Sequence, residues 1–287
     1  MEHFSVCLIQ PANYVHSQGL LEVCQLLCCS LESIGLPCRF QTNRIEPDAI
    51  NIVVGYHLLD PPAAARLAAA RLILYQLEQL SDREGWFSRE REAVLRAAWA
   101  IWDYSPENVA FLKNRGFPRV EYLPLGFHPA LRRILHPEDS DRNIDVLFYG
   151  SLNPRRAAIL EALRRQCRAH ALFGVYGETR DRYIARARIL LNIHFYQAAI
   201  LEQVRLAYLL NNECFVISEE AGHNPFAGGI VTGPYAKLVS LCETYLAQPE
   251  SRKQVAARGF RDFASRPMTE YLQPLLLSLT PACGAIP

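Results

Sequence analysis

The stretch "IDVLFYGSLNPRRAAILEALRRQC", residues 144–167, decides the fold class. It opens with an apolar run typical of a buried strand, turns at Gly150, and continues into a basic amphipathic helix. Glycine permits a close backbone approach or a positive φ at the turn. Ser151 or Asn153 can cap the helix that follows, and Pro154 suits its first turn. The stretch therefore predicts a strand–turn–helix unit.

Two arginines stand at the start of this predicted helix. Arg155 and Arg156 place positive charge at the positive end of the helix dipole, which costs a few tenths of a kcal/mol each. A bound diphosphate would compensate that charge, since helix N-termini favour anions. The turn is neither a P-loop nor a G-x-G-x-x-G motif, so a solvated arginine pair is the alternative interpretation.

Short apolar runs alternate with helical patterns along the whole chain, which favours α/β units with parallel strands covered on both faces. The candidate strands are Ser5–Ile9, Ile52–Gly55, Leu72–Tyr75, Trp99–Trp102, Val120–Leu123, Asp145–Tyr149, Leu172–Tyr176, Ile189–Ile193, Cys214–Ile217 and Gly229–Val231. The alternation restarts after a proline-rich, charged segment. We therefore predict two Rossmann-like domains facing across a cleft, with boundaries 1–128, a linker at 129–143, 144–263, and a C-terminal helix or tail at 264–287 that can cross back to the first domain.

Composition sets bounds on location and partners. The chain has 287 residues and a net charge of +1, with 14 Lys/Arg against 17 Asp/Glu before residue 144 and 16 against 12 after it. The second half is thus the more favourable one for an anionic ligand, with ordinary scatter as the alternative.

No apolar run approaches the roughly 18–20 residues that span a bilayer. No signal peptide is recognised, and the nine cysteines, without C-x-x-C or zinc spacing, are read as free thiols. We expect a cytoplasmic protein.

A second motif lies in "LLNIHFYQAAILEQVRLAYLLNNECFVISEEAG", residues 190–222, which predicts a strand, a loop, a helix and another strand. Glu202 falls in the first turn of the predicted helix, where the dipole favours a carboxylate for purely structural reasons. The same carboxylate could accept hydrogen bonds from two vicinal ribose hydroxyls. The backbone amides of the preceding residues, which include Gln197, Ala198 and Ala199, would meet a diphosphate at the helix N-terminus.

On these residues the second half resembles the donor-binding domain of GT-B glycosyltransferases, in particular the group-1 (glycogen synthase-like) class. That class carries Glu-x7-Glu, whose second Glu binds the nucleotide ribose, and Glu202 matches it within "LEQVRLAYLLNNECFVIS". The segment "GPYAKLVSLCETYLAQPESRKQVAARGFRDF", residues 233–263, resembles the end of the family's donor domain. The turn after Tyr149 matches the region whose basic residues contact the diphosphate. The resemblance covers residues 100–263 and extends weakly over residues 1–99.

One position departs from the family pattern. The first Glu of Glu-x7-Glu, which approaches the sugar in retaining enzymes, is replaced by His194. A histidine can donate or accept a hydrogen bond there but supplies no carboxylate. The stereochemical outcome, retaining or inverting, therefore stays open.

The resemblance implies that residues 1–128 bind the acceptor, whose hydroxyl must lose a proton to a general base. His16 lies in the loop after the first strand and has a suitable ordinary pKa, with an exposed loop histidine as the alternative. Glu78 ranks next, followed by Asp60 and His57, all beyond the ends of predicted strands.

The resemblance implies a glycosyltransferase that uses a nucleoside-diphosphate sugar and needs no cofactor. Neither predicted domain contains Asp-x-Asp, so we expect metal-independent transfer in which arginines and helix amides stabilise the diphosphate. The group that accepts the sugar is a hydroxyl or an amine, and the acceptor stays open among a protein, a saccharide, a lipid, a small molecule and a nucleobase. The alternatives are a nucleotide-sugar epimerase of the same fold and a non-catalytic nucleotide-binding subunit.

Overall fold

The computed structural model describes residues 3–59, 71–81, 87–196 and 198–279. The chain divides into two compact units. Unit 1 comprises Met1–Ala12, Leu20–His128 and Arg266–Pro287, and unit 2 comprises Asn13–Gly19 and Pro129–Ser265. Each unit is described by itself below.

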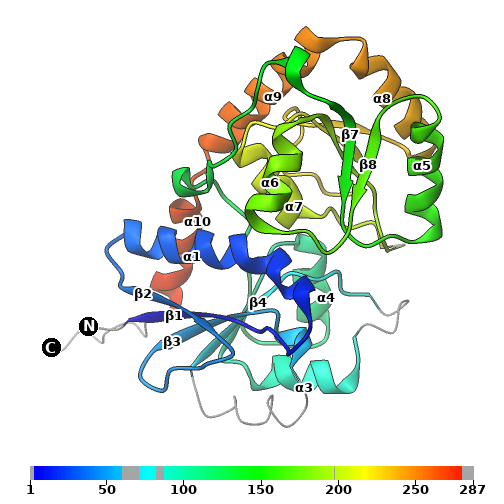
Figure 1. Cartoon of the computed structure of the whole chain (residues 1–287). Coiled ribbons are helices and arrows are strands. Elements are labelled where there is room, and N and C mark those ends of the chain that lie inside the picture. Colours follow the sequence, from blue (N-terminus) through cyan, green and yellow to red (C-terminus); the bar gives the residue numbers. More distant parts are fainter. Residues whose placement is uncertain (1–2, 60–70, 82–86, 197, 280–287) are drawn as a thin grey trace, which may run out of the picture. The chain divides into compact units, whose positions relative to one another are not determined.

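Unit 1 is built on a six-stranded sheet in the order β2-β1-β3-β4-β5-β6, and every neighbouring pair is parallel (Figure 1). The central strands β1, β3 and β4 are buried on both faces, as their continuous apolar sequences predict. The strands are β1 (Phe4–Leu8), β2 (Cys38–Thr42), β3 (Ile50–Val54), β4 (Leu72–Gln76), β5 (Ala100–Asp103) and β6 (Val120–Tyr122). The helices are α1 (Leu21–Ser33), α3 (Arg89–Ala97), α4 (Pro106–Asn114) and α10 (Met268–Leu279).

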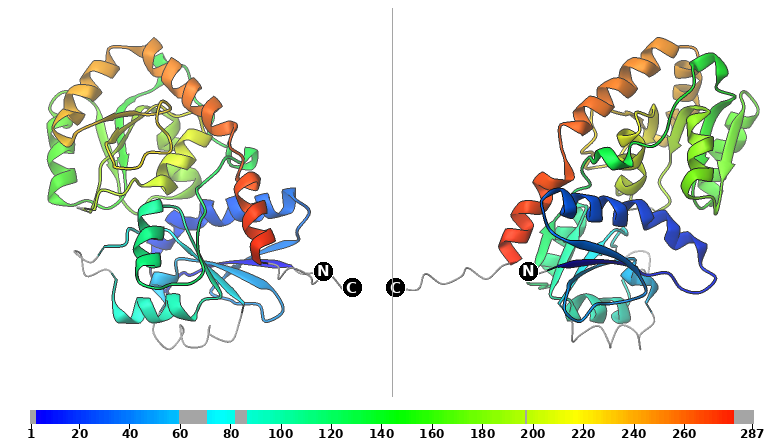
Figure 2. Two further views of the ribbon diagram at one scale, coloured as in Figure 1. Left: turned by 180° about the vertical axis from the view of Figure 1, so that it is seen from behind. Right: turned by 60° about the vertical axis from the view of Figure 1, so that its left-hand side comes forward.

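Local sequence signals explain where the helices of unit 1 begin. The Ser88 side chain accepts a hydrogen bond from the Arg91 amide at the start of α3, and Ser105 caps α4 in the same way. Helix α10 packs against α1, and Figure 2 shows it (red) beside α1 (blue). The amide of Phe127 donates to the Arg266 carbonyl and Met268 donates back to Phe127, each at 2.9 Å, which fixes the start of this last segment.

Unit 2 contains a five-stranded parallel sheet in the order β11-β10-β9-β7-β8. Its core is formed by apolar side chains of β7 and β9 packed against α5 and α8. The strands are β7 (Ile144–Tyr149), β8 (Ala169–Leu172), β9 (Ala187–Asn192), β10 (Val216–Glu219) and β11 (Val231–Gly233). The helices are α5 (Pro154–Arg164), α6 (Gly177–Ala185), α7 (Gln203–Asn211), α8 (Leu238–Leu246) and α9 (Pro249–Ala264).

The two parallel sheets with interspersed helices confirm the predicted α/β class, and the strand predictions fail only near sheet edges. Edge strand β2 was not predicted, because the sequence CRFQT lacks an apolar run and is largely exposed. The predicted strand Leu172–Tyr176 is wrong. Strand β8 ends at Leu172, Phe173 is 58% exposed, and Gly174 turns the chain with a φ of 69°.

Two segments belong to unit 2 that the sequence analysis treated differently. Residues 129–143, predicted as a linker, are fixed to unit 2, where the Asn212 side chain bonds to the amides of Arg133 and Ile134 and to the Leu131 carbonyl. Residues 13–19, between β1 and α1, are also assigned to unit 2. Among the described residues, no helix is both long enough and apolar enough to span a bilayer.

Helix α9 approaches the loop before β11 so closely that glycine is required on it. A Cβ at Gly259 would lie 2.4 Å from the Gly229 carbonyl oxygen, whereas a Cβ at Gly222 would meet nothing within 4 Å. We expect Gly259→Ala to lower the free energy of unfolding by about 1–3 kcal/mol, because α9 must shift. Gly222→Ala is the matched control, with a change within about 0.5 kcal/mol. Equal urea midpoints for the two variants, followed by circular dichroism, would contradict this close packing.

Candidate functional site

The topology of unit 2 indicates where a ligand would bind. The chain runs from β7 to β8 on one side and then returns to β9 on the other, so the sheet order switches between β7 and β9. Ligands of open α/β sheets bind outside the carboxyl ends of the strands at such a switch point. The residues that follow β7 and β9 are therefore the first to consider.

The turn after β7 has the geometry of a close-approach site. Gly150 has a φ of 131°, a conformation that favours glycine, and a Cβ there would lie 2.6 Å from Nη2 of Arg205 and displace that side chain. Asn153 caps α5, since its side chain accepts the amide hydrogen bond of Arg156 at 2.9 Å. Ser151, the other candidate cap, is exposed, and its carbonyl accepts from Nη1 of Arg156.

The two arginines of this turn face different surroundings. Arg156 is 3% exposed and donates from Nε to the Ile193 carbonyl at 2.9 Å and from Nη2 to Glu202 at 3.2 Å. Arg155 is the outer residue, with 37% of its side chain exposed, and forms an ion pair with Glu219 while stacking on Tyr235. Arg156 therefore joins the loop after β9 to α5, and Arg155 is the one that solvent reaches.

Glu202 is the centre of a buried polar network. It is the residue immediately before α7 and does not cap the helix with its side chain. Its Oε1 accepts from Arg156, and its Oε2 accepts from Nδ2 of Asn192 and from His194, both at 3.0 Å. Three of the roughly four acceptor positions of the carboxylate are thus occupied within the described residues. Simultaneous bonds to two ribose hydroxyls, as predicted from the sequence, would require one of these contacts to change.

His194 is held as a cation in this network. The ring is 1% exposed; Nδ1 contacts the Glu202 carboxylate, and Nε2 lies 2.9 Å from the Glu220 carbonyl. Both partners are acceptors, so both ring nitrogens must donate. Burial alone would lower the pKa of His194, but the hydrogen bond and charge of Glu202 raise it above its ordinary value, and they lower the pKa of Glu202. Neither ring nitrogen is directed at a ligand, in contrast to the predicted contact with a sugar.

The loop between β9 and α7 offers fewer amides than expected. The amide of Ala199 donates to the Tyr196 carbonyl at 3.3 Å, and Ala199 has a φ of 50°, an unusual conformation for a residue with a side chain. Ala198 lies in the same turn, and Gln197 lies outside the described residues. The predicted row of free amides is therefore reduced.

Arg205, which the sequence did not indicate as a site residue, lies on the first turn of α7. Its Nη1 donates to Oδ1 of Asn192 at 2.7 Å, and its guanidinium stacks over Phe148 and Tyr149. Its Nε is buried without a hydrogen-bond partner among the described residues. The helical pattern alone gave no sign of this placement, because it depends on the approach of α7 to the turn at Gly150.

Cations outnumber carboxylates in this cluster. Among the described residues, the carboxylate partners of Arg155, Arg156, Arg205 and His194 are Glu202 and Glu219. Burial, and next the charge of Arg205, lower the pKa of Arg156 to about 10. An anion placed beside the two guanidinium groups would relieve that repulsion. The cluster has the electrostatics of an anion site.

In unit 1, two of the predicted bases come together at the carboxyl ends of β3 and β4. Nε2 of His57 lies 3.5 Å from Oε1 of Glu78. Burial raises the pKa of Glu78 to about 7 and lowers that of His57 to about 4, so the histidine is neutral beside a carboxyl group that titrates near neutrality. His57 lines a cavity of about 300 Å³ that is also bounded by Tyr56 and Arg91.

The backbone of Glu78 is fixed by two amide side chains. Its carbonyl accepts hydrogen bonds from Gln76 and from Nδ2 of Asn108, and its amide donates to Oε1 of Gln76 at 3.1 Å. Asn108 is held in turn by the buried Asp103 at 3.1 Å. This chain of contacts fixes the backbone from which the Glu78 side chain projects.

The other predicted bases are placed elsewhere. Nδ1 of His16 lies 2.7 Å from the hydroxyl of Tyr176, and its ring packs on Phe173, within unit 2. Asp60 lies outside the described residues. His16 thus belongs to a different unit from the Glu78–His57 pair.

One acidic pattern bears on the predicted metal independence. An Asp-x-Asp pattern does occur, at Asp139–Asp141 in the predicted linker, but Asp139 is paired with Arg252 at 2.7 Å and with Arg188 at 3.5 Å.

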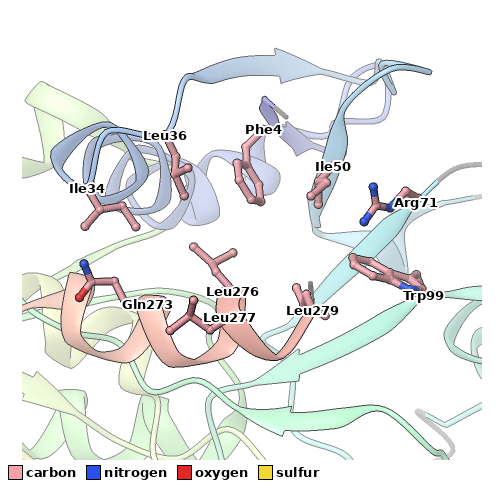
Figure 3. Close-up of a pocket in the computed structure, with 10 residues that line it drawn as sticks. All are labelled: Phe4, Ile34, Leu36, Ile50, Arg71, Trp99, Gln273, Leu276, Leu277 and Leu279. Atoms are coloured by element: carbon pink, nitrogen blue, oxygen red, sulfur yellow. The ribbon is translucent and has the colours of Figure 1, made fainter. Parts of the chain in front are cut away.

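A larger cavity of about 520 Å³ lies in unit 1 near the amino ends of β1 and β3, lined by α10 and Trp99 (Figure 3). It is mainly apolar and contains none of the predicted site residues.

The His194–Glu202 pair should make stability depend on pH. A raised folded pKa means that the contribution of His194 is complete below its unfolded value of about 6.5 and is lost as the pH rises through the folded pKa. The lowered pKa of Glu202 makes its contribution present above about 4.5. We expect the stability advantage of wild type over His194→Gln to shrink as the pH rises above 6.5. Urea midpoints of both proteins from pH 5.5 to 8.5 measure this difference, and an advantage that grows over that range would contradict a cationic His194.

No family model matches the sequence. Three curated relatives are uncharacterized proteins of Acanthamoeba polyphaga mimivirus. L137 is 28% identical over 60% of this chain and 23% of its own length, L140 is 26% identical over 51% and 51%, and R358 is 27% identical over 63% and 65%. The chain thus spans less than two thirds of each of these relatives.

Solved structures give a clearer likeness. An alpha-glucosyltransferase in complex with UDP and a DNA 13-mer matches with a TM-score of 0.68 and 8% identity, over 98% of this chain and 100% of that one. WaaG, a glycosyltransferase of lipopolysaccharide biosynthesis, matches at 0.62 and 13% (96% and 99%), and T4 phage BGT in complex with UDP-glucose matches at 0.61 and 10% (98% and 100%). The chain therefore has the GT-B glycosyltransferase fold.

Proposed function

We propose that the protein transfers a sugar from a nucleoside-diphosphate sugar to an acceptor hydroxyl, with the donor held by unit 2 and the acceptor proton taken by Glu78 of unit 1. The bond between the anomeric carbon and the diphosphate oxygen breaks, and a bond from that carbon to the acceptor oxygen forms. The acceptor proton passes to the Glu78 carboxylate, and the diphosphate leaves as an anion.

The observation that carries the donor half is the excess of cations at the switch point of the unit 2 sheet. Arg205 has a buried Nε without a described partner, and its guanidinium lies beside that of Arg156 over Gly150. Oxygen atoms of a diphosphate would supply acceptors for Arg205 and Arg155 and offset their charge. In this proposal the leaving group is stabilised by arginines, without a metal ion.

The base is assigned to Glu78 rather than to His16, which ranked first from the sequence. A base works best when its pKa lies near the operating pH, and burial brings Glu78 to about 7. His57, which is neutral beside it, can hold the acceptor hydroxyl by a hydrogen bond. His16 already shares a hydrogen bond with Tyr176.

The names of the structural neighbours support a nucleotide-sugar donor. Two are described in complex with UDP or UDP-glucose; one of these is also bound to a DNA 13-mer that contains a HMU base, and a third neighbour is involved in lipopolysaccharide biosynthesis. The acceptor of this protein is left as a hydroxyl compound.

Calorimetric titration with UDP, GDP, TDP and ADP tests the donor half. We expect one of them to bind, and Arg205→Ala to weaken that binding about 10- to 100-fold, because a charged hydrogen bond contributes roughly 1.5–3 kcal/mol. Arg182→Ala removes an exposed arginine of the same unit, 72% exposed and paired only with Glu178 by a surface ion pair, and should leave binding unchanged. No binding of any diphosphate by the folded protein would refute the donor site.

Product analysis then separates the proposal from its alternatives. Consumption of the matching sugar donor with an acceptor present, and resistance to a metal chelator, are expected for metal-free transfer. Conversion of the donor to an isomer without any acceptor would identify an epimerase instead. Binding without turnover on a broad acceptor panel would identify a non-catalytic subunit.

Glu78→Gln tests the base. We expect kcat to fall about 10²- to 10⁴-fold with unchanged donor affinity, since a neutral amide accepts no proton. In wild type the rate should rise with pH through about 7, as Glu78 loses its proton, and then level off. Glu121→Gln, at an exposed position of the same unit, is the control. A Glu78→Gln enzyme that keeps the wild-type pH profile would rule out Glu78 as the base.

A further inference from the structure

Two cysteine thiols meet on the surface of unit 1, apart from the Glu78–His57 pair. Sγ of Cys38 lies 3.3 Å from Sγ of Cys28. Cys28 lies on α1 and Cys38 is the first residue of β2, and both are partly exposed free thiols. Two side chains whose sulfur atoms already touch need little backbone movement to form a bond.

The position of the pair gives such a bond a structural consequence. Strand β2 is the edge strand of the six-stranded sheet and bonds to β1 on one side only. Most of its residues are exposed, so the ladder with β1 and the contact with α1 hold it in place. A covalent link to α1 would fix the strand at its first residue.

We propose that Cys28 and Cys38 form a reversible disulfide when the protein meets an oxidant of the small-molecule disulfide class, such as oxidised glutathione. The site is a modification site of unit 1 and is independent of the proposed transfer reaction.

The chemistry takes two exchange steps. The Cys38 sulfur attacks one sulfur of oxidised glutathione, forms a mixed disulfide and releases one glutathione thiol. The Cys28 sulfur then attacks Sγ of Cys38 and releases the second glutathione. The two protein thiols lose two electrons and two protons in all, and one oxidised glutathione becomes two reduced molecules. Cys38 attacks first because the hydrogen bond with Cys38, together with burial, raises the pKa of Cys28 and so disfavours the Cys28 thiolate.

The full-length protein is incubated with excess oxidised glutathione, free thiols are blocked, and the product is cleaved after glutamate. Cleavage at Glu22, Glu32 and Glu78 separates residues 23–32, which carry Cys28, from residues 33–78, in which Cys38 is the only cysteine; Glu46 is not cleaved because Pro47 follows it. We expect these two peptides to be joined by a disulfide that a dithiol reductant reverses. Cys28→Ser and Cys38→Ser should each abolish the link. Cys29→Ser, the neighbouring thiol in the same peptide, should retain it.

A second readout does not depend on the peptide map. The oxidised wild type should melt about 5 °C higher than the reduced protein, because the link closes a short loop in the unfolded chain. The amides of β2 should exchange more slowly with solvent. Glutathione that remains attached to Cys38 in the wild type, or a link that Cys29→Ser removes, would overturn the proposal.

Discussion

The candidate donor site lies at the carboxyl ends of the strands in unit 2, and the carboxylate of Glu202 links the segments that meet there. It receives hydrogen bonds from Arg156 at the start of α5, from Asn192 at the end of β9 and from His194 just after that strand. Three segments distant in sequence are thereby fixed around one buried anion. Removal of one partner from a buried charge network costs about 3–5 kcal/mol, because the remaining charge is left without compensation. The positions of Gly150 and the arginines therefore depend on this one contact set.

The same network changes the meaning of the most family-like residue in the chain. The sequence indicated a glutamate that is free to bind a ribose, whereas the structure surrounds Glu202 with three donors. His194, which replaces the first glutamate of the pattern, accounts for part of the change. It supplies a buried cation that a second carboxylate could not, and it keeps Glu202 ionised. The replacement of glutamate by His194 and the altered hydrogen bonding of Glu202 therefore have the same cause, the contact between these two side chains.

The sequence predicted those parts of the structure that depend on local pattern. Buried central strands such as β4 and β7 read as apolar runs, and the Asn153 cap and Pro154 mark the start of α5. The edge strands β2 and β8 were not predicted correctly, because an exposed strand needs no apolar run. Arg205 was not predicted as a site residue for another reason. Its place in the site follows from the packing of α7 against the turn at Gly150, and side-chain spacing along one helix carries no information about that contact. The sequence predicted Glu78 and His57 as separate candidates beyond the ends of two strands, and it did not predict the contact between them.

An uncompensated cluster of cations has a consequence for stability as well as for binding. Burial of Arg156 beside Arg205 lowers the pKa of Arg156 and so destabilises the unliganded unit relative to one that holds an anion there. A ligand that binds only the folded state adds RT ln(1 + [L]/Kd) to the free energy of unfolding. If the cluster binds a diphosphate as proposed, the same charge excess would make unit 2 more stable in the bound state. Ligand affinity and fold stability in this unit follow from the same few guanidinium groups.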